Sequence, residues 1–157
     1  MNQPYISAKA VIVREDGNIL ALRRSKTCPR RPLSWDLPGG DVEFGEDLGQ
    51  SIIREIKEEA GLVVPEVTLF DAIGFVAKDG DYWVTLGYVT RVPQDAAVVI
   101  SWEHDQYEWI TKEEFLQRES TDRIKRFLNN TNVRTESTKY ENSNHPTSVL
   151  PSEEGRR

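Results

Sequence analysis

The chain has 157 residues, which is the length of one domain with room for a terminal extension. Its 26 Asp and Glu side chains outnumber its 20 Lys and Arg side chains, and the net charge of −6 argues against a protein that coats nucleic acid. With 38% hydrophobic and 29% charged residues, the composition suits a globular core and excludes a bundle of membrane-spanning helices.

The supply of metal-binding side chains is limited. The single cysteine, Cys28, cannot form an internal disulfide or a cysteine-based zinc site, and the only histidines are His104 and His145. A metal site is therefore expected to consist mainly of carboxylates, which favour hard ions such as Mg²⁺ and Mn²⁺. The first residues lack a basic start followed by an apolar run, so no signal peptide is predicted and a cytoplasmic location is expected.

The first part of the chain carries strand and turn signals. Residues 5–13 and 18–23 are predicted to be two strands that are joined by an Asp-Gly hairpin turn at 16–17. Residues 24–34 are basic and contain proline, which indicates a loop. The Leu-Pro-Gly-Gly run at 37–40 indicates a further interruption of regular structure.

A helix is predicted from Asp47 to Ala60. Leu48, Ile52 and Ile56 recur every four residues, which is the spacing of one helical face. A glycine follows at position 61, where a helix of this length should end.

The remaining part returns to strands and ends in two short helices. Residues 67–77 and 82–92 alternate in hydrophobicity around an Asp-Gly turn, which predicts a second hairpin. Residues 107–110 are expected to form a short strand, Thr111 opens a short helix with a capping box, and residues 121–128 form the last helix. This order of elements predicts an α+β layered domain.

The last 27 residues, 131–157, differ in composition from the rest. They hold four large apolar side chains among many Ser, Thr, Asn and Pro residues, and their four acids balance their four bases. Such a segment cannot bury enough apolar surface to offset the entropy of ordering it. We therefore predict one domain over residues 1–130, which carries the net charge, and a disordered tail over residues 131–157.

The predicted central helix carries three carboxylates on one face. Glu55, Glu58 and Glu59 stand at i, i+3 and i+4, and their mutual repulsion costs roughly a few tenths of a kcal/mol per pair. A bound divalent cation would reverse the sign of this interaction. Runs of Glu, Lys and Arg also occur on ordinary solvated helices, so the pattern alone leaves a structural or interaction module open.

The spacing around these glutamates is more specific. It reads Gly, five residues, Glu, seven residues, Arg-Glu, an aliphatic residue, any residue, Glu-Glu, any residue, Gly and an aliphatic residue. This pattern resembles the signature of the Nudix hydrolases, with seven fixed residue types and two aliphatic positions in register. The matching residues are Gly40, Glu46, Arg54, Glu55, Ile56, Glu58, Glu59, Gly61 and Leu62. The segments 35–40 and 103–110 also resemble the family, so the likeness covers about residues 5–128.

The resemblance implies an α/β/α sandwich around a mixed β-sheet. It also implies a hydrolase that cleaves a diphosphate linkage in a nucleoside diphosphate attached to another group. Glu55, Glu58 and Glu59 would bind Mg²⁺ or Mn²⁺, with the Gly39 carbonyl as a further ligand. Arg54 would serve catalysis by orienting Glu55 or Glu58. Electrostatics points the same way, because an acidic face cannot hold a polyphosphate unless a cation neutralises it.

The general base is left open by the resemblance. It is either Glu55 itself or an acid on a later loop, for which Glu103 is the first candidate and Glu108 the second. His104 is expected to pack in the fold rather than to act as a base.

Cationic and aromatic side chains are candidates for contacts with the substrate. Arg23 and Arg24 point to opposite faces of a strand, so one of them is expected to face the pocket, where guanidinium suits phosphate. Gly40 is expected to let the backbone approach a phosphate. Trp35 is a candidate for stacking on a base, with core packing as the alternative. The neighbouring basic side chains are Lys26, Arg30 and Arg31, and the other aromatic candidates are Phe75, Tyr82 and Trp83.

The substrate is only loosely indicated. Lys78 stands where ADP-ribose hydrolases of the family carry proline, and Tyr82 comes a few residues late for the dinucleoside polyphosphate pattern. The resemblance therefore implies a small nucleotide as partner, with (d)NTPs or their oxidised forms as the default substrates. Nucleic-acid polymers and membranes are not expected as partners, and a homodimer stays open. The alternatives are a nucleotide-sugar or ADP-ribose diphosphatase and a non-catalytic, nucleotide-binding regulatory domain.

Overall fold

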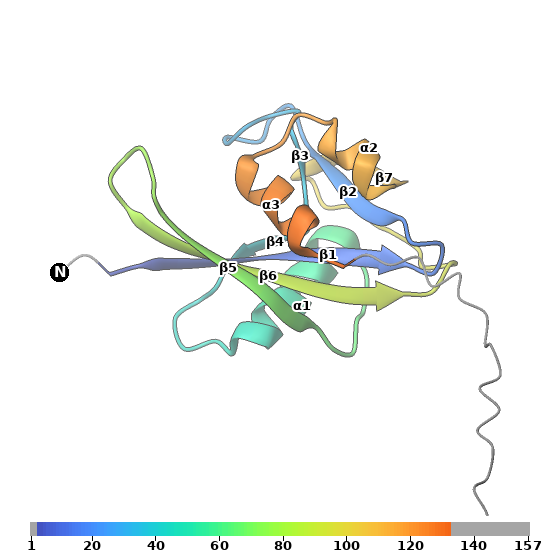
Figure 1. Cartoon of the computed structure of the whole chain (residues 1–157), viewed down its shortest axis with the longest axis horizontal. Helices are drawn as coiled ribbons and strands as arrows, with labels where there is room; N and C mark the ends of the chain where they lie inside the picture. Colours follow the sequence, from blue (N-terminus) through green and yellow to red (C-terminus); the bar gives the residue numbers. More distant parts are fainter. Residues whose placement is uncertain (1–2, 133–157) are drawn as a thin grey trace, which may run out of the picture.

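Side chains along strand β1 (Tyr5–Arg14) alternate between two buried faces. Ala8, Ala10 and Ile12 belong to one hydrophobic core, whereas Val11 and Val13 belong to a second. A strand that is buried on both sides must lie in the middle layer of a three-layer structure. The computed structural model describes residues 3–132 and shows this strand crossing the centre of the domain (Figure 1).

The sheet around β1 has the strand order β3-β2-β1-β6-β5. β1 and β6 run parallel and the other paired strands run antiparallel, so the sheet is mixed as expected. β4 pairs with the first half of β1, and β7 pairs with β2. The strands besides β1 are β2 (Ile19–Arg24), β3 (Trp35–Asp36), β4 (Gly39–Asp41), β5 (Thr68–Val76), β6 (Tyr82–Val92) and β7 (His104–Ile110).

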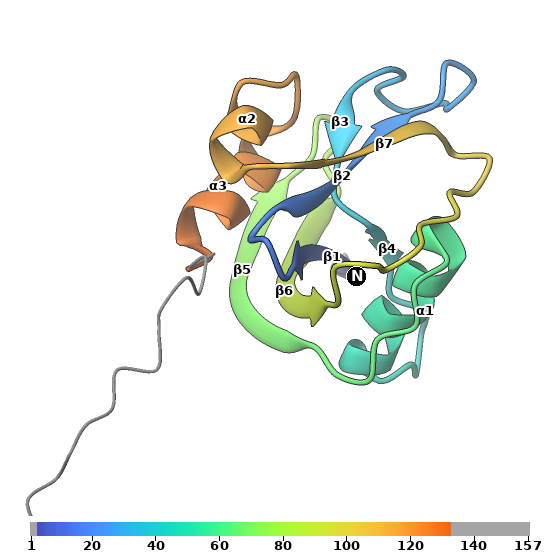
Figure 2. The same cartoon turned by 90° about the vertical axis from the view of Figure 1, so that its right-hand side faces the viewer.

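Helices cover both faces of the sheet. α1 (Leu48–Ala60) buries Ile52 and Ile56 in the first core, and α2 (Lys112–Leu116) and α3 (Asp122–Asn130) contribute to the second core. Figure 2 shows α1 on one side of the strands and α2 and α3 on the other. The α+β sandwich expected from the sequence is therefore confirmed.

The predicted elements match the observed ones, with two short strands added. β3 lies between the predicted loop at 24–34 and the predicted interruption at 37–40, and β4 begins inside that interruption, which was predicted because proline and glycine are poor strand formers. Gly39 pairs with Lys9 in the sheet at φ +146°, and a side chain at Gly39 would meet the Ala8 carbonyl oxygen at 2.0 Å. β4 therefore depends on glycine, since any larger residue would push it away from β1. β7 also begins three residues earlier than expected, at His104.

The predicted helix end at Gly61 and the predicted capping box at Thr111 are confirmed, and Asp47, expected as the first helical residue, is the N-cap. The Asp47 side chain accepts from the Gln50 N–H at the start of α1, and Gly61 ends that helix in the left-handed conformation at φ 67°. The Thr111 hydroxyl accepts from the Glu114 N–H, and the Glu114 carboxylate accepts from the Thr111 N–H, which completes the capping box of α2.

Two further features concern the predicted tail and the membrane. The predicted tail lies outside the described residues from position 133 onward. Within residues 3–132, no helix is both long enough and apolar enough to cross a membrane.

Candidate active site

An open cleft of about 1190 Å³ lies where α1, β1 and β4 meet the β5–β6 hairpin, the β2–β3 loop and the start of α3. Carboxylates from α1 and the segment before β7 line it, together with arginines from the β2–β3 region and α3. The site residues predicted from the sequence that line this cleft are Arg24, Gly39, Gly40, Glu55, Glu59 and Glu103. The fold thus brings together residues that are up to 79 positions apart in the sequence (from Arg24 to Glu103).

Glu59 lies at the inner end of the cleft. Its side chain is almost fully buried, and its Oε2 accepts a hydrogen bond from the Gly39 N–H at 2.9 Å. Burial raises the pKa of Glu59 to about 8, although the Lys9 ammonium nearby acts in the opposite direction. A carboxylate in this position gains most from a cation bound in the cleft, because desolvation penalises its charge.

Arg54 organises the acidic face of α1. Its guanidinium donates to both oxygens of Glu46, at 2.7 and 3.1 Å, and also to Glu55 at 3.0 Å and Glu58 at 3.1 Å. Burial raises the pKa of Glu55, and Arg54 only partly offsets this effect. Arg54 holds the pKa of Glu46 down at about 2, so Glu46 stays ionised and anchors the guanidinium. Arg54 thus contacts both glutamates that it was predicted to orient.

Glu58, which also accepts from Arg54, differs from Glu55 and Glu59 in its exposure to solvent. The Glu58 side chain is 57% exposed and is not among the residues that line the cleft, whereas Glu55 and Glu59 are. The buried face of α1, set by Ile52 and Ile56, turns Glu59 inward and leaves Glu58 at the rim. Its predicted part in metal binding therefore needs the side chain to move away from Arg54.

The chemistry of the donor groups fits a hard divalent cation. Glu55, Glu59 and Gly39 line the cleft, and their carboxylate and carbonyl oxygens are of the type that Mg²⁺ and Mn²⁺ prefer, although the Gly39 carbonyl accepts from Lys9 at 3.4 Å. Glu59 is buried with a neutral N–H as its donor, and the Lys9 ammonium nearby offsets only part of the cost of burying its charge. Within the described range, no three His, Cys, Asp or Glu groups stand close enough together to form a metal site.

Gly40 leaves room for the Glu55 carboxylate. A Cβ atom at this position would lie 2.7 Å from Glu55 Oε1 and 2.8 Å from its carboxyl carbon. The Gly40 backbone therefore lies close to the Glu55 side chain. The contact between this backbone and a substrate phosphate that the sequence predicted stays a prediction.

Replacing Gly40 with Ala should displace Glu55 and lower kcat by about 10- to 100-fold, because small misplacements of catalytic groups have effects of this size. The matched control is Gly49→Ala on α1, where the added Cβ would meet its nearest atom at 3.4 Å. That control should keep full activity and gain about 0.5–1 kcal/mol of stability. Steady-state rates and melting temperatures of both variants test this, and an active Gly40→Ala enzyme would contradict it.

Besides Arg54 and Glu58, the candidates Arg23, Trp35 and Glu108 do not line the cleft. Arg23 points away from it and donates to Asp105 at 2.7 Å, so Arg24 is the arginine that faces the pocket. Trp35 is buried in the second core, with the Arg118 guanidinium 4.6 Å above its ring, so the packing alternative holds. Glu108 accepts from Arg118 at 2.7 Å, away from the cleft. Arg23 and Trp35 are held by partners from a distant part of the chain, which the local pattern does not reveal.

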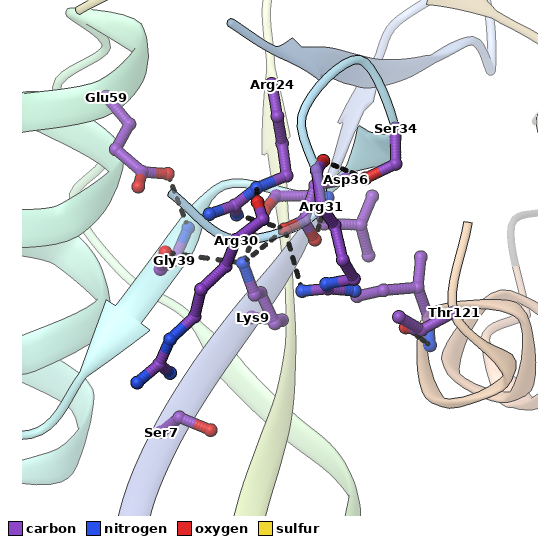
Figure 3. A network of polar contacts seen from close by, with 12 residues as sticks. Ser7, Lys9, Arg24, Arg30, Arg31, Ser34, Asp36, Gly39, Glu59 and Thr121 are labelled. Carbon is purple, nitrogen blue, oxygen red and sulfur yellow. Dashed lines mark hydrogen bonds and ion pairs between the residues drawn. The ribbon is translucent and has the colours of Figure 1, made fainter. Parts of the chain in front are cut away.

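Two ionic residues of the site, the buried Asp36 and the partly buried Lys9, were not predicted. Asp36 is 1% exposed, and its Oδ2 accepts from Lys9 and Arg24, both at 3.0 Å, with Arg31 at 3.9 Å (Figure 3). Lys9 also donates to the Gly39 carbonyl at 3.4 Å, so it connects this cluster to the glutamate side of the cleft. A lone lysine inside the apolar run of β1 was the available signal, since a charge there needs a buried partner.

Aromatic side chains form part of the cleft wall. Phe75 and Trp83 line it as the sequence suggested, and the Trp83 ring stacks on Tyr5 at 4.9 Å between centroids. Tyr82 lies outside this cleft. His104 is buried next to Glu103, and burial lowers its pKa to about 4, which leaves it neutral at pH 7 and agrees with the packing role expected for it.

Comparisons with known proteins agree with this architecture. A family model described as NUDIX domain matches residues 4–130. A MutT-like protein from Streptomyces ambofaciens is 34% identical over 117 residues, covering 72% of this chain and 68% of that protein. A CTP pyrophosphohydrolase from Escherichia coli strain K12 is 29% identical over 112 residues, covering 71% of this chain and 80% of that protein.

Solved structures point the same way. The structure of a MutT protein from Methanosarcina mazei Go1 aligns with a TM-score of 0.70 at 29% identity, covering 82% of this chain and 94% of that chain. Two other curated relatives are matched over 29% and 44% of their own length, so the chain spans less than half of those proteins. The family model covers the acidic helix, the Gly39–Gly40 strand and both walls of the cleft, and the chain accordingly belongs to the NUDIX domain family.

Proposed function

We propose that this protein is a Mg²⁺- or Mn²⁺-dependent hydrolase that cleaves the diphosphate linkage of small nucleotides, with nucleotide-pool (d)NTPs as the first candidates and the cytoplasm as its location. The observation that carries the proposal is the cleft itself. Glu55, Glu59 and Gly39 line it, and arginines line the same cavity. The similarity to a protein named CTP pyrophosphohydrolase supports a nucleotide as substrate.

The residues in and around the cleft have different roles in this proposal. Glu55 and Glu59 would hold the metal, with Gly39 as a further ligand and Glu58 reaching it from the rim. A bound divalent cation would neutralise the phosphate oxygens and acidify the attacking water. Arg54 orients Glu55 through its 3.0 Å contact. Phosphoryl transfer depends mainly on positioning and charge neutralisation, which this arrangement can supply.

Glu103 is the general base in this proposal. It lines the cleft, and its backbone carbonyl accepts from the Ser25 N–H at 2.8 Å, which fixes the segment that carries it. Arg54 donates to Glu55, and this hydrogen bond favours the ionised form of Glu55 and so makes it a weaker proton acceptor.

Replacing Glu103 with Gln should therefore lower kcat about 100-fold or more, the usual contribution of a positioned general base. Glu108→Gln is the control, because Glu108 is bound by Arg118 and Gln106 outside the cleft, and its rate should stay near that of the wild type. The pH dependence of kcat for both variants completes the test. An unchanged rate in Glu103→Gln would transfer the role to Glu55.

The proposal as a whole is tested with a hydrolysis panel in Mg²⁺ or Mn²⁺. The panel contains dNTPs, 8-oxo-dGTP, ADP-ribose, nucleotide sugars and dinucleoside polyphosphates, with Glu59→Gln as the blank. Resolving the products as nucleoside monophosphate, phosphate or pyrophosphate identifies the bond that is cleaved. Preferred cleavage of a triphosphate is the expected result. Cleavage of ADP-ribose or nucleotide sugars alone would assign the protein to that class, and binding without turnover would favour a regulatory domain.

A further inference from the structure

Arg123 is a cation of the cleft that the proposed chemistry does not use. It lies at the start of α3, is half-buried, and lines the cavity. Its guanidinium lies 3.8 Å from the centre of the Phe75 ring. Within residues 3–132, no carboxylate oxygen lies within 4.0 Å of Arg123. A partly desolvated guanidinium that is stacked on an aromatic ring, and that has no ion-pair partner within the described residues, has its N–H donors available to an anion.

Arg31 adds a second incompletely neutralised charge. Asp36 is the only carboxylate that approaches it within the described residues, and the 3.9 Å separation is long because Lys9 and Arg24 already occupy the same oxygen at 3.0 Å. One negative charge thus faces three positive charges. Arg31 also has φ 46°, a left-handed conformation that non-glycine residues rarely adopt, and strain of this kind is concentrated at functional sites.

The two arginines influence one another. Both side chains line the same cleft, and burial together with repulsion from the positive charge of Arg31 lowers the pKa of Arg123, whereas Asp36 acts in the opposite direction. This repulsion would become an attraction if an anion bound between them. Thr121 caps α3 beside Arg123 and also lines the cleft, so the positive end of the helix dipole faces the same region.

The position of Arg31 and Arg123 relative to Glu55 and Glu59 indicates which part of a ligand the two arginines can bind. In Figure 3, Glu59 and Gly39 lie on one side of the polar network and Thr121 on the other, with Arg31 between them. An anion at Arg31 and Arg123 would therefore bind apart from a diphosphate held at Glu55 and Glu59. The arginines would then neutralise one part of an extended ligand, and a divalent cation bound at the glutamates would neutralise another.

We propose that Arg31 and Arg123 form an anion subsite for an additional phosphate of the substrate, beyond the diphosphate held at the glutamates. The subsite selects nucleoside triphosphates over nucleoside diphosphates linked to neutral sugars. This specificity role rests on the hydrolase proposed above, but the binding of phosphate at the two arginines does not require turnover.

Turnover provides the first test, with ATP and ADP-ribose as substrates that share a base and differ in the terminal group. Arg123→Gln and Arg31→Gln should lower kcat/KM for ATP by about 10- to 100-fold, the range for losing a charged hydrogen bond, and should leave ADP-ribose nearly unaffected. The matched control is Arg126→Gln on the same helix, because Arg126 is exposed and pairs with Asp71 outside the cleft. Equal losses on both substrates would overturn the specificity role.

Binding provides the second test and is independent of catalysis. Inorganic tripolyphosphate is titrated calorimetrically into the full chain without metal, for the wild type and the three variants, after melting curves confirm that each is folded. Its affinity should fall about 10-fold in Arg123→Gln and Arg31→Gln and should stay unchanged in Arg126→Gln. Absence of binding to the wild type, or equal binding by all four proteins, would overturn the subsite. Arginine-dependent binding in a protein that hydrolyses nothing would keep the subsite and reject the hydrolase.

Discussion

Replacing Glu59 with Gln is expected to lower kcat by about 100-fold or more while the protein stays folded. The amide oxygen of Gln can still accept from the Gly39 N–H, so the 2.9 Å contact between α1 and β4 survives. The negative charge is lost, and with it a metal ligand in the proposed mechanism. Charge stabilisation by a bound metal contributes several kcal/mol to the transition state, and about 1.4 kcal/mol corresponds to a factor of ten in rate.

Thermal melting with and without Mg²⁺ separates loss of metal binding from loss of fold. A ligand that binds only the native state raises its melting temperature, so the wild type should be stabilised by Mg²⁺ and Glu59→Gln should respond much less. The control is Glu66→Gln, because Glu66 is an exposed glutamate outside the cleft lining. If Glu59→Gln kept the wild-type rate and the wild-type response to Mg²⁺, Glu59 would not be a metal ligand.

Replacing Asp36 with Asn should have the largest effect on stability. Asp36 is 1% exposed and accepts from Lys9 and Arg24, so its loss leaves two partly buried cations without a counterion. Removing one partner of a buried ionic network costs about 3–5 kcal/mol. For a domain of this size, that corresponds to a decrease in melting temperature of roughly 10 °C. Calorimetry at pH 7 measures it.

The matched control for Asp36 is Asp105. Asp105 pairs with Arg23 at 2.7 Å, but both side chains are about one-third exposed, so Asp105→Asn should cost no more than about 1 kcal/mol. Similar losses in the two variants would show that burial of Asp36 adds nothing to the interaction.

The contribution of Asp36 should depend on pH in a defined direction. Burial raises the pKa of this carboxyl, but Lys9, Arg31 and Arg24 outweigh that effect and hold the pKa below its usual value. A carboxyl whose pKa is lower in the folded state stabilises the fold above its unfolded pKa of about 3.9 and loses this effect as the pH falls through the folded value. The difference in stability between the wild type and Asp36→Asn should therefore shrink below about pH 4.

The sequence determined the parts of the protein that depend on local spacing. The i, i+4 recurrence of Ile52 and Ile56 places the apolar face of α1, and the capping residues at its ends set its length. Because the helical repeat is regular, the same spacing also predicts that Glu55 and Glu59 share a face. The two hairpins follow from Asp-Gly turns for the same reason, since two residues decide each turn.

The tertiary structure decided which side chains share the cleft. Strand alternation alone did not predict which of Arg23 and Arg24 faces the cleft. Their ion pairs decide this, because Arg23 pairs with Asp105 outside the cleft and Arg24 pairs with Asp36. The same holds for Arg123, which reaches the cleft only because α3 packs near β5. Ion pairs and cavities depend on burial and on contacts between residues far apart in the chain, so local sequence patterns do not predict them. Helices and turns depend on neighbouring residues, so the sequence shows them directly.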